Sequence, residues 1–183
     1  MINFNKIGLL VAVMFSTFFL ISCNESTEQQ SGDLTSASTE TSSAETLKSG
    51  SIVSLSEKEV NVIDGEYFTV DIVMNDFVVT EGGAITLRFN SKVLQVSSVN
   101  VNRNNWSFIN SNGQVDNVEG VISDIVFSSY QGVSGDAVIA TVEFKAINKG
   151  LTHIALEESL ANPFASNGQT MAVSFISSNV VSN

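Results

Sequence analysis

Few residues of this sequence have the types and spacing that catalysis requires. The chain has 183 residues, with one cysteine, Cys23, and one histidine, His153. A single cysteine allows no intramolecular disulfide, and zinc sites built from cysteine and histidine clusters are excluded. Glu157 and Glu158 are adjacent, and neighbours on a strand point to opposite faces, so they cannot converge on one bond. Because no nucleophile, base and orienting group come together, we predict that the protein is not an enzyme.

The segment from Asn110 to Glu119 is the candidate for a metal site, because its Asn, Asp and Gly residues resemble a calcium loop. Counted as an EF-hand from Asn110, position six is Val115 and position twelve is Val121, where such a loop needs Gly and Glu. Clusters of Asn and Gly commonly form turns. We therefore predict turns here, with no metal and no cofactor.

Trp106 is the residue best suited to stacking on a sugar ring. A carbohydrate platform normally has several coplanar aromatic rings. Besides Trp106 the sequence offers two tyrosines, Tyr67 and Tyr130, and twelve phenylalanines, most of them at inward-facing or N-terminal positions. The pattern favours a core or edge anchor for Trp106, with sugar stacking as the alternative.

Cys23 ends an N-terminal apolar segment. Lys6 precedes an uncharged run over residues 7–21, which is 15 residues long. A bilayer-spanning helix needs about 20 residues, whereas a signal-peptide core is shorter. The run closes with Leu20-Ile21-Ser22-Cys23, which resembles a bacterial lipobox. The resemblance implies a lipoprotein signal peptide over residues 1–22, cleavage before Cys23, and a diacylglycerol thioether on Cys23 with N-acylation in many bacteria.

Residues 23–50 comprise the lipidated cysteine and a linker rich in Ser, Thr and Glu. Residues 24–50 contain five acidic residues and one lysine. Such a composition cannot bury enough apolar surface to offset chain entropy, which predicts a disordered tether. Asn24 stands where Asp would direct such lipoproteins to the inner membrane, so a lipid anchor in the outer membrane of a bacterial envelope is favoured.

The charge balance excludes one class of partner. The chain has 8 Lys and Arg against 19 Asp and Glu, a net charge of −11. An anionic surface repels phosphate backbones, so nucleic-acid binding is not expected.

Residues 51–183 have the composition of a folded all-β domain. Val, Ile, Phe and Thr recur with a period of two between Gly and Asn residues, and no helical period is sustained. Regularly spaced strands of this kind are typical of a β-sandwich. The expected strands cover residues 51–55, 67–74, 84–90, 94–101, 114–117, 121–128, 137–147, 153–156 and 171–178.

Alternation along these strands assigns side chains to faces. Ile85, Leu87 and Phe89 are expected to point inward, as are Ile125 and Phe127. The side chains expected to point outward are Ala84, Thr86, Arg88, Ile122, Asp124, Val126, Ile139, Thr141 and Glu143.

The order of these features resembles a cohesin module, the β-sandwich that receives dockerin modules in cellulosome scaffolds. The resemblance covers residues 51–181, and its strongest parts are the corner Leu-Arg-Phe-Asn-Ser-Lys-Val-Leu over residues 87–94 and the segment over residues 135–150. It implies a nine-stranded jelly-roll β-sandwich, a fold that some carbohydrate-binding modules share.

In cohesins the dockerin lies across the sheet of strands eight, three, six and five. The outward positions of strand three correspond to Gly82, Ala84 and Thr86, and well-studied cohesins place Asn and Asp near the first two. Gly and Ala there imply a different, more apolar specificity. The expected partner-binding residues are Ala84, Thr86, Arg88, Ile122, Asp124, Val126, Thr141 and Glu143.

The resemblance and the N-terminus together predict a membrane-anchored cohesin-like module for non-catalytic recognition of a protein partner that is dockerin-bearing or similar. A cell-surface carbohydrate-binding module is the alternative, and a structural envelope protein is a third hypothesis. The lipid anchor is the expected contact with the membrane.

Overall fold

The computed structural model describes residues 50–183, which form an all-β module without a helix. The expected class, a jelly-roll β-sandwich, is confirmed. The predicted signal peptide, Cys23 and the tether up to residue 49 lie outside the described residues. Within the described part, no helix has the length and apolar character needed to cross a membrane.

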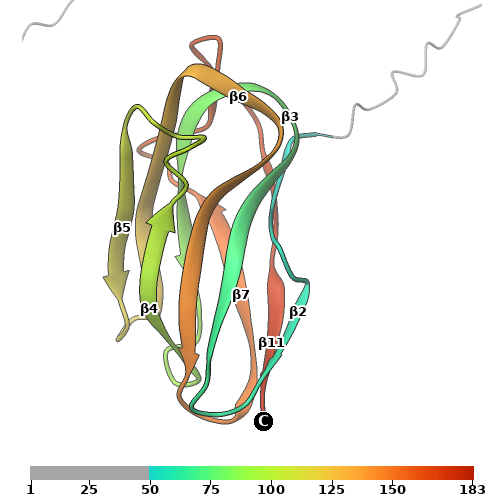
Figure 1. Ribbon diagram of the computed structural model, residues 1–183, viewed down its shortest axis with the longest axis vertical. Coiled ribbons are helices and arrows are strands. Elements are labelled where there is room, and N and C mark those ends of the chain that lie inside the picture. Colours follow the sequence, from blue (N-terminus) through green and yellow to red (C-terminus); the bar gives the residue numbers. More distant parts are fainter. Residues whose placement is uncertain (1–49) are drawn as a thin grey trace, which may run out of the picture. The chain divides into compact units, whose positions relative to one another are not determined.

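Eleven strands make up the module (Figure 1). They are β1 (Ile52–Leu55), β2 (Glu59–Val62), β3 (Tyr67–Arg88), β4 (Leu94–Val101), β5 (Asn110–Asp116), β6 (Val121–Ala146), β7 (Gly150–Glu158), β8 (Ala165–Ser166), β9 (Gln169–Thr170), β10 (Ser174–Ile176) and β11 (Ser178–Ser182). β2, β8, β9 and most of β11 were not among the strands expected from the sequence.

Two strands are much longer than the strands expected from the alternation of apolar and polar residues. β3 has 22 residues and β6 has 26, and each joins two of the expected strands into one. The pair is antiparallel from Tyr67↔Lys145 to Arg88↔Val121, with several register shifts between Ile72 and Leu87. Figure 1 shows both strands arching over one end of the sandwich, so that each contributes one half to either sheet. We call this the arched end.

The two sheets follow from the strand pairing. The front sheet consists of β7, residues 82–88 of β3, residues 121–128 of β6, and β5. The back sheet consists of β10, β1, residues 67–74 of β3, residues 137–146 of β6, and β4. β2 pairs in parallel with β11, which in turn pairs with β7 and extends that side of the sandwich.

Aromatic rings fill the space between the sheets. Trp106, Phe127, Phe144 and Phe164 are fully buried. The Trp106 and Phe127 ring centroids lie 4.7 Å apart at 66°, and those of Phe127 and Phe164 lie 5.3 Å apart. Edge-to-face contacts between aromatic rings stabilise a core by more than the burial of their apolar surface alone.

Strict alternation fails at two bulges in β6. Ile85 and Leu87 of β3 are opposite Ile125 and Ile122, so two steps on one strand match three on the other. Asp124 adopts a positive φ of 55° at this point. The extra residue of a bulge reverses the faces beyond it, and Ile122 is therefore buried. The predicted outward orientation of Ile122 is wrong.

Ile139 is misplaced for the same reason. Ile72 and Val73 of β3 are opposite Ala140 and Val138, which leaves Ile139 as the extra residue between them. Its side chain is buried in the core rather than outward-facing.

Candidate partner-binding surface

The eight residues expected to bind a partner do not share one face. Thr141 and Glu143 belong to the half of β6 that lies in the back sheet, where they pair with Asp71 and Thr69. The Thr141 hydroxyl donates to the Asp71 carboxylate at 2.5 Å. The other six residues lie in the front sheet, so the predicted surface is wrong in joining Thr141 and Glu143 to them.

Ala84 is also unavailable to a partner, although it was expected to point outward. Its exposed fraction is 0%. The Ser159 hydroxyl, beyond the end of β7, donates to Asp124 Oδ1 on β6 at 2.8 Å, while the Ser159 N–H donates to the Ala84 carbonyl at 3.0 Å. These two bonds join the segment that follows β7 to β6 and to β3 beside Ala84.

Gly82 shows why this strand departs from the polar pattern of cohesins. A Cβ atom at position 82 would lie 2.4 Å from the carbonyl oxygen of Phe127. The close approach of the two backbones excludes any side chain, including the Asn that the resemblance leads one to expect.

Four of the predicted residues remain on the outer face of the front sheet: Thr86, Arg88, Asp124 and Val126. Arg88 Nε contacts Glu157 Oε2 at 2.9 Å, and more than half of each side chain is exposed. A pair this exposed contributes about 0–1 kcal/mol to stability and fixes two side chains on the surface. The sequence analysis considered Glu157 only as a catalytic residue. Its place on this face follows from the pairing of β7 with β3, in which Glu157 lies opposite Thr86, and no sequence pattern indicates that pairing.

The adjacent glutamates diverge, as predicted. Glu157 faces solvent beside Arg88, whereas Glu158 Oε1 accepts the Phe164 N–H at 3.0 Å. Within residues 50–183, no group of three His, Cys, Asp or Glu side chains is placed to hold a metal ion.

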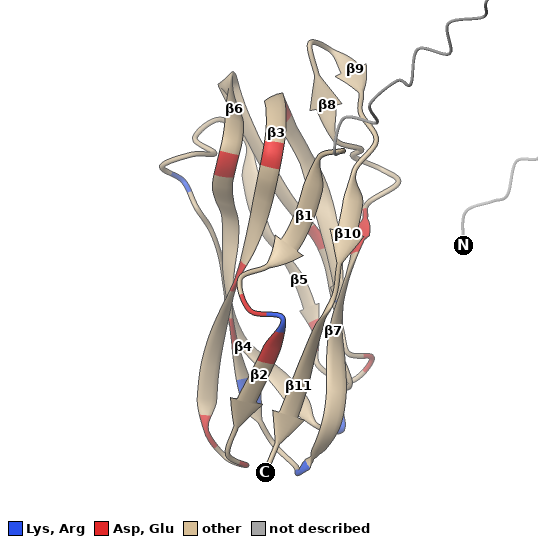
Figure 2. Cartoon of the chain, turned by 90° about the vertical axis from the view of Figure 1, so that its right-hand side faces the viewer, with Lys and Arg blue, Asp and Glu red and all other residues tan. Residues whose placement is uncertain are grey.

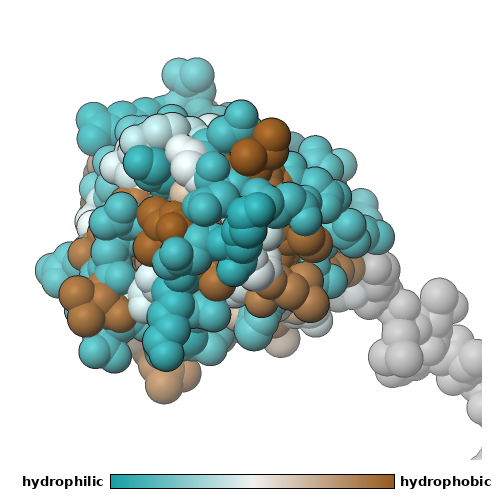
Figure 3. All heavy atoms as spheres, turned by 90° about the horizontal axis from the view of Figure 1, so that it is seen from below, coloured by the Kyte–Doolittle hydropathy of each residue, from teal (hydrophilic) through white to brown (hydrophobic). Residues whose placement is uncertain are grey.

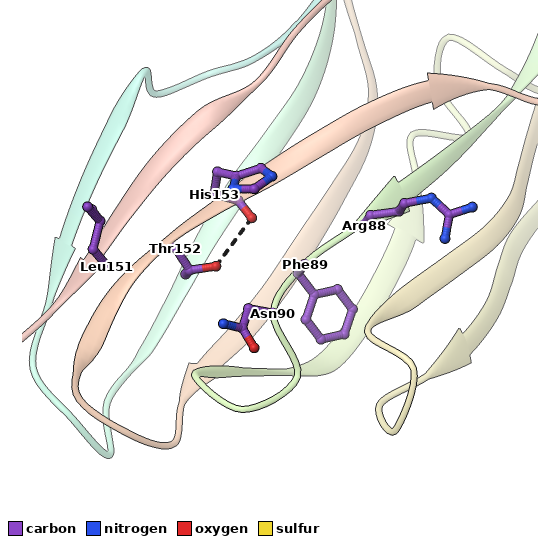
Figure 4. A pocket seen from close by; sticks show the side chains of 6 residues that line it. All are labelled: Arg88, Phe89, Asn90, Leu151, Thr152 and His153. Carbon is purple, nitrogen blue, oxygen red and sulfur yellow. Dashed lines mark hydrogen bonds between the residues drawn. The ribbon is translucent and has the colours of Figure 1, made fainter.

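A hollow of about 260 Å³ lies where β3 and β7 separate (Figure 4). Arg88, Phe89 and Asn90 line one side, and Leu151, Thr152 and His153 line the other. His153 is exposed, as predicted. The Thr152 hydroxyl donates to the His153 carbonyl rather than to the ring, so the hollow presents no hydroxyl–imidazole pair suited to nucleophilic catalysis.

The Asn- and Gly-rich segment closes one side of the sandwich. Asn117 Oδ1 accepts the Val96 N–H at 2.7 Å and Asn117 Nδ2 donates to the Val96 carbonyl at 3.1 Å. Asn112 Oδ1 accepts the Val101 N–H at 3.1 Å. The side-chain oxygens of Asn112 and Asn117 are therefore bonded to the backbone of β4.

We expect Asn117→Ala to lower the free energy of unfolding by about 1–3 kcal/mol, because both Val96 backbone groups lose a partly buried partner. Urea unfolding followed by circular dichroism measures the change. Asn104→Ala, in an exposed loop, is the matched control and should stay within about 0.5 kcal/mol of the wild type. Equal effects of the two substitutions would contradict this role of Asn117.

Asp116 stabilises the turn that follows β5. Its Oδ1 accepts the Val118 N–H at 2.8 Å and the Glu119 N–H at 3.0 Å. Both bonds favour the ionised carboxylate, and together they hold the pKa of Asp116 below its ordinary value of 3.8. The bond from the Glu119 N–H has the larger effect on this pKa.

The lowered pKa predicts a pH dependence of stability. Because the folded-state pKa lies below the unfolded-state pKa, the carboxylate's contribution is fully present above the unfolded value and is lost as the pH falls through the folded value. An NMR titration of the Asp116 carboxyl carbon should give a midpoint below 3.8. Asp116→Asn should remove this part of the acid-induced loss of stability, and an unchanged acid profile would contradict the assignment.

Trp106 is a core residue. Its exposed fraction is 0%, and its indole N–H donates to the Val138 carbonyl at 3.1 Å. The core interpretation is confirmed, and sugar stacking by Trp106 is wrong because neither ring face reaches solvent. Phe108 and Tyr130 are exposed, but their rings are inclined at 66° and form no coplanar platform.

The sequence interpretation missed an apolar area at the arched end of the front sheet. Phe108 and Ile109 precede β5, and Tyr130 lies in the bend of β6. All three are exposed. Phe108 and Ile109 fall in an irregular segment, where alternation assigns no face, so only the three-dimensional arrangement brings them beside Tyr130.

The geometry defines a β-sandwich whose front sheet exposes Arg88, Asp124 and Glu157 on its outer face, with no metal-ligating cluster among the described residues. No family model matches the sequence, and no curated protein matches it. Solved structures do match its fold, which is that of cohesin domains.

A non-cellulosomal cohesin from the archaeon Archaeoglobus fulgidus has a TM-score of 0.62 at 15% identity, over 73% of this chain and 91% of that chain. The seventh ScaB type I cohesin of Pseudobacteroides cellulosolvens has a TM-score of 0.56 at 17% identity, and the match covers 73% of this chain and 92% of that chain. The third ScaC cohesin of Acetivibrio cellulolyticus was solved in complex with the ScaB dockerin. It has a TM-score of 0.57 at 15% identity, and the match covers 72% of this chain and 98% of that chain.

Proposed function

We propose that this chain is a non-catalytic recognition module that binds a dockerin-bearing protein through the outer face of its front sheet. The observation that carries the proposal is the cohesin fold, presented with this face open to solvent. Several cohesins of similar structure were solved as complexes with dockerins. A chain with the same architecture is suited to the same kind of partner.

The composition of the face supports protein recognition. Thr86, Arg88 and Glu157 make its centre polar, and Val126 continues toward the apolar area at the arched end. An apolar area bordered by charged and polar side chains is typical of specific protein interfaces. The exposed aromatics lack the coplanar arrangement that would favour carbohydrate as the ligand.

We further propose that the module is displayed on a bacterial envelope. The lipobox-like segment ending at Cys23 supports lipid anchoring, and Asn24 favours the outer membrane. Residues 24–50, as a flexible chain, have a mean reach of roughly 30 Å, from about 5–6 Å multiplied by the square root of the residue number. Such a tether would hold the recognition face clear of the lipid headgroups.

Affinity capture from the source bacterium tests the proposal. Epitope-tagged full-length protein, solubilised in mild detergent, is expected to retain a dockerin-bearing protein and to release it when calcium is chelated, since dockerin folding requires calcium. Labelling with radioactive palmitate, with Cys23→Ala as the control, tests the anchor. Retention on insoluble polysaccharide, with no protein captured, would overturn the proposal in favour of a carbohydrate-binding module.

A further inference from the structure

The chain that precedes the described residues joins the module at the arched end. β1 follows Gly50, and its first residue, Ile52, pairs with Asn75 just before the bend of β3. The Ser51 carbonyl accepts the Ser174 N–H at 3.0 Å, which fixes the point of entry against β10. Figure 2 shows that β1 begins at the end of the sandwich where β3 and β6 bend. A membrane attachment before residue 50 would therefore act on this end of the module.

The bends of β3 and β6 expose apolar side chains at the same end. The exposed fraction is 53% for Val78, 47% for Val79, 62% for Phe108 and 86% for Tyr130. A Cβ atom at Gly132, two residues after Tyr130, would lie 2.5 Å from Val79 Cγ1. The ring centroids of Phe108 and Tyr130 lie 6.0 Å apart. The two bends are thus in contact, and we call Val78, Val79, Phe108 and Tyr130 the apolar crest.

The crest differs from ordinary exposure of apolar residues. Single exposed apolar side chains are common, whereas a cluster of them marks an interaction site. At the opposite end of the module, shown in Figure 3, apolar side chains are scattered among hydrophilic ones. The β8–β9 hairpin adjoins the crest, because the Ser166 hydroxyl donates to the Val79 carbonyl, and its turn contains the polar residue Asn167. Apolar side chains beside polar ones suit the boundary between lipid headgroups and acyl chains.

Charge limits the kind of lipid that this end can approach. Residues 50–183 contain six basic and fourteen acidic residues, a net charge of −8, and acidic positions predominate in Figure 2. Asp76 and Asp136 lie beside the crest, where the Asp76 N–H donates to the Asp136 carboxylate at 3.0 Å. Anionic headgroups attract basic segments and would repel this end. Zwitterionic headgroups, which have no net charge, are the lipid surface that fits it.

The proposed tether makes even a weak contact effective. With Cys23 held in the membrane, residues 24–50 would have a mean reach of roughly 30 Å and would lead to the arched end. A short flexible linker gives the attached module an effective concentration of about 1 mM. A contact with a dissociation constant of about 1 mM would then be occupied roughly half of the time. A small apolar surface is therefore enough to keep this end at the membrane.

We propose that the apolar crest contacts a zwitterionic lipid surface, as a second membrane contact besides the lipid on Cys23. This inference rests on the lipid anchoring in the proposed function. Tyr130 is the crest residue best suited to the headgroup level, because tyrosine rings are enriched at membrane interfaces. The strands of the front sheet run along the long axis of the module (Figure 1), so its outer face would stay open to a protein partner.

Fluorescence quenching by brominated lipid tests the inference. Full-length Tyr130→Trp protein is incorporated into phosphatidylcholine vesicles in which part of the lipid is brominated. Trp106, the single native tryptophan, is buried, and the wild type measures its background. The added indole is expected to lose roughly half of its emission to the brominated lipid. Val78→Asp in the same protein should restore that emission, because it places a charge on the crest.

Leu151→Trp is the matched control, because Leu151 is also exposed but lies near the start of β7, at the opposite end of the module. Its added indole should keep its emission. Mixing anionic phosphatidylglycerol into the vesicles should reduce the quenching at position 130. Equal quenching of the two probes, no quenching at position 130, or quenching that neither Val78→Asp nor phosphatidylglycerol reduces would overturn the inference.

The proposed recognition function is measured separately in the same vesicles. Calcium-dependent capture of a dockerin-bearing protein should be equal for the wild type and Val78→Asp, because Val78 lies in the bend of β3 and not in the front sheet. Capture without quenching at position 130 would leave recognition intact and reject the crest alone. Protein that stays in solution, without attachment to vesicles, would reject the lipid anchor and this inference together.

Discussion

Trp106→Ala is expected to lower the free energy of unfolding by about 3–5 kcal/mol, the largest loss we expect from a single truncation in this module. The indole is fully buried against Phe127, and its N–H is bonded to the Val138 carbonyl. Truncation leaves a cavity between the sheets and removes one of the two side-chain donors to the Val138 carbonyl, because Asn105 Nδ2 also donates to it at 3.2 Å. Chemical denaturation followed by far-ultraviolet circular dichroism measures the loss.

Two variants separate packing from the hydrogen bond. Trp106→Phe keeps much of the ring volume and removes the N–H, so it should lose less stability than Trp106→Ala. Phe108→Ala truncates an exposed aromatic two positions along the chain and should cost less than about 1 kcal/mol. If Phe108→Ala were as destabilising as Trp106→Ala, the central packing role of Trp106 would be wrong.

The corner after β3 shows how far the sequence could predict the fold. Asn90 lies two residues beyond the end of β3, its Oδ1 accepts the Lys92 N–H, and its carbonyl accepts the Val93 and Leu94 N–H groups. Val93 and Leu94 then enter the core. The hydrogen bonds of Asn90 join near neighbours in the chain, and contacts of that kind can be inferred from a sequence.

The recognition surface was harder to predict because it depends on contacts between distant residues. Alternation was correct for Ile85, Leu87 and Phe89, which are buried. It failed beyond the bulge at Asp124, since the sequence shows a period of two but not the insertion of one residue into a ladder.

The error over Thr141 and Glu143 has a different physical origin. Side chains alternate in the halves of β6 on both sides of its bend, so the sequence of β6 does not reveal where the strand changes sheet. Pairing with β3 decides this: Val126 lies opposite Ala84 in the front sheet, whereas Thr141 lies opposite Asp71 in the back sheet.

Thr86→Tyr is expected to reduce capture of the protein partner by roughly 30- to 1,000-fold, which corresponds to the loss of about 2–4 kcal/mol at the centre of an interface. Thr86 is half-buried on the outer face of the front sheet and pairs with Glu157. A phenol ring there would project from the outer face of the front sheet and separate this face from its partner. Tyr and Thr both favour strands, so the fold should persist. Surface plasmon resonance with the captured partner measures the change.

Thr69→Tyr makes the same exchange on the same strand but on the other sheet. Thr69 is exposed and lies opposite Glu143 in the back sheet, so this variant should capture the partner as the wild type does. The comparison holds the strand, the residue types and the added volume constant, and changes the face that receives the ring. Loss of capture in Thr69→Tyr alone would move the binding surface to the back sheet, whereas equal loss in both variants would assign the effect to the fold of β3 and not to the interface.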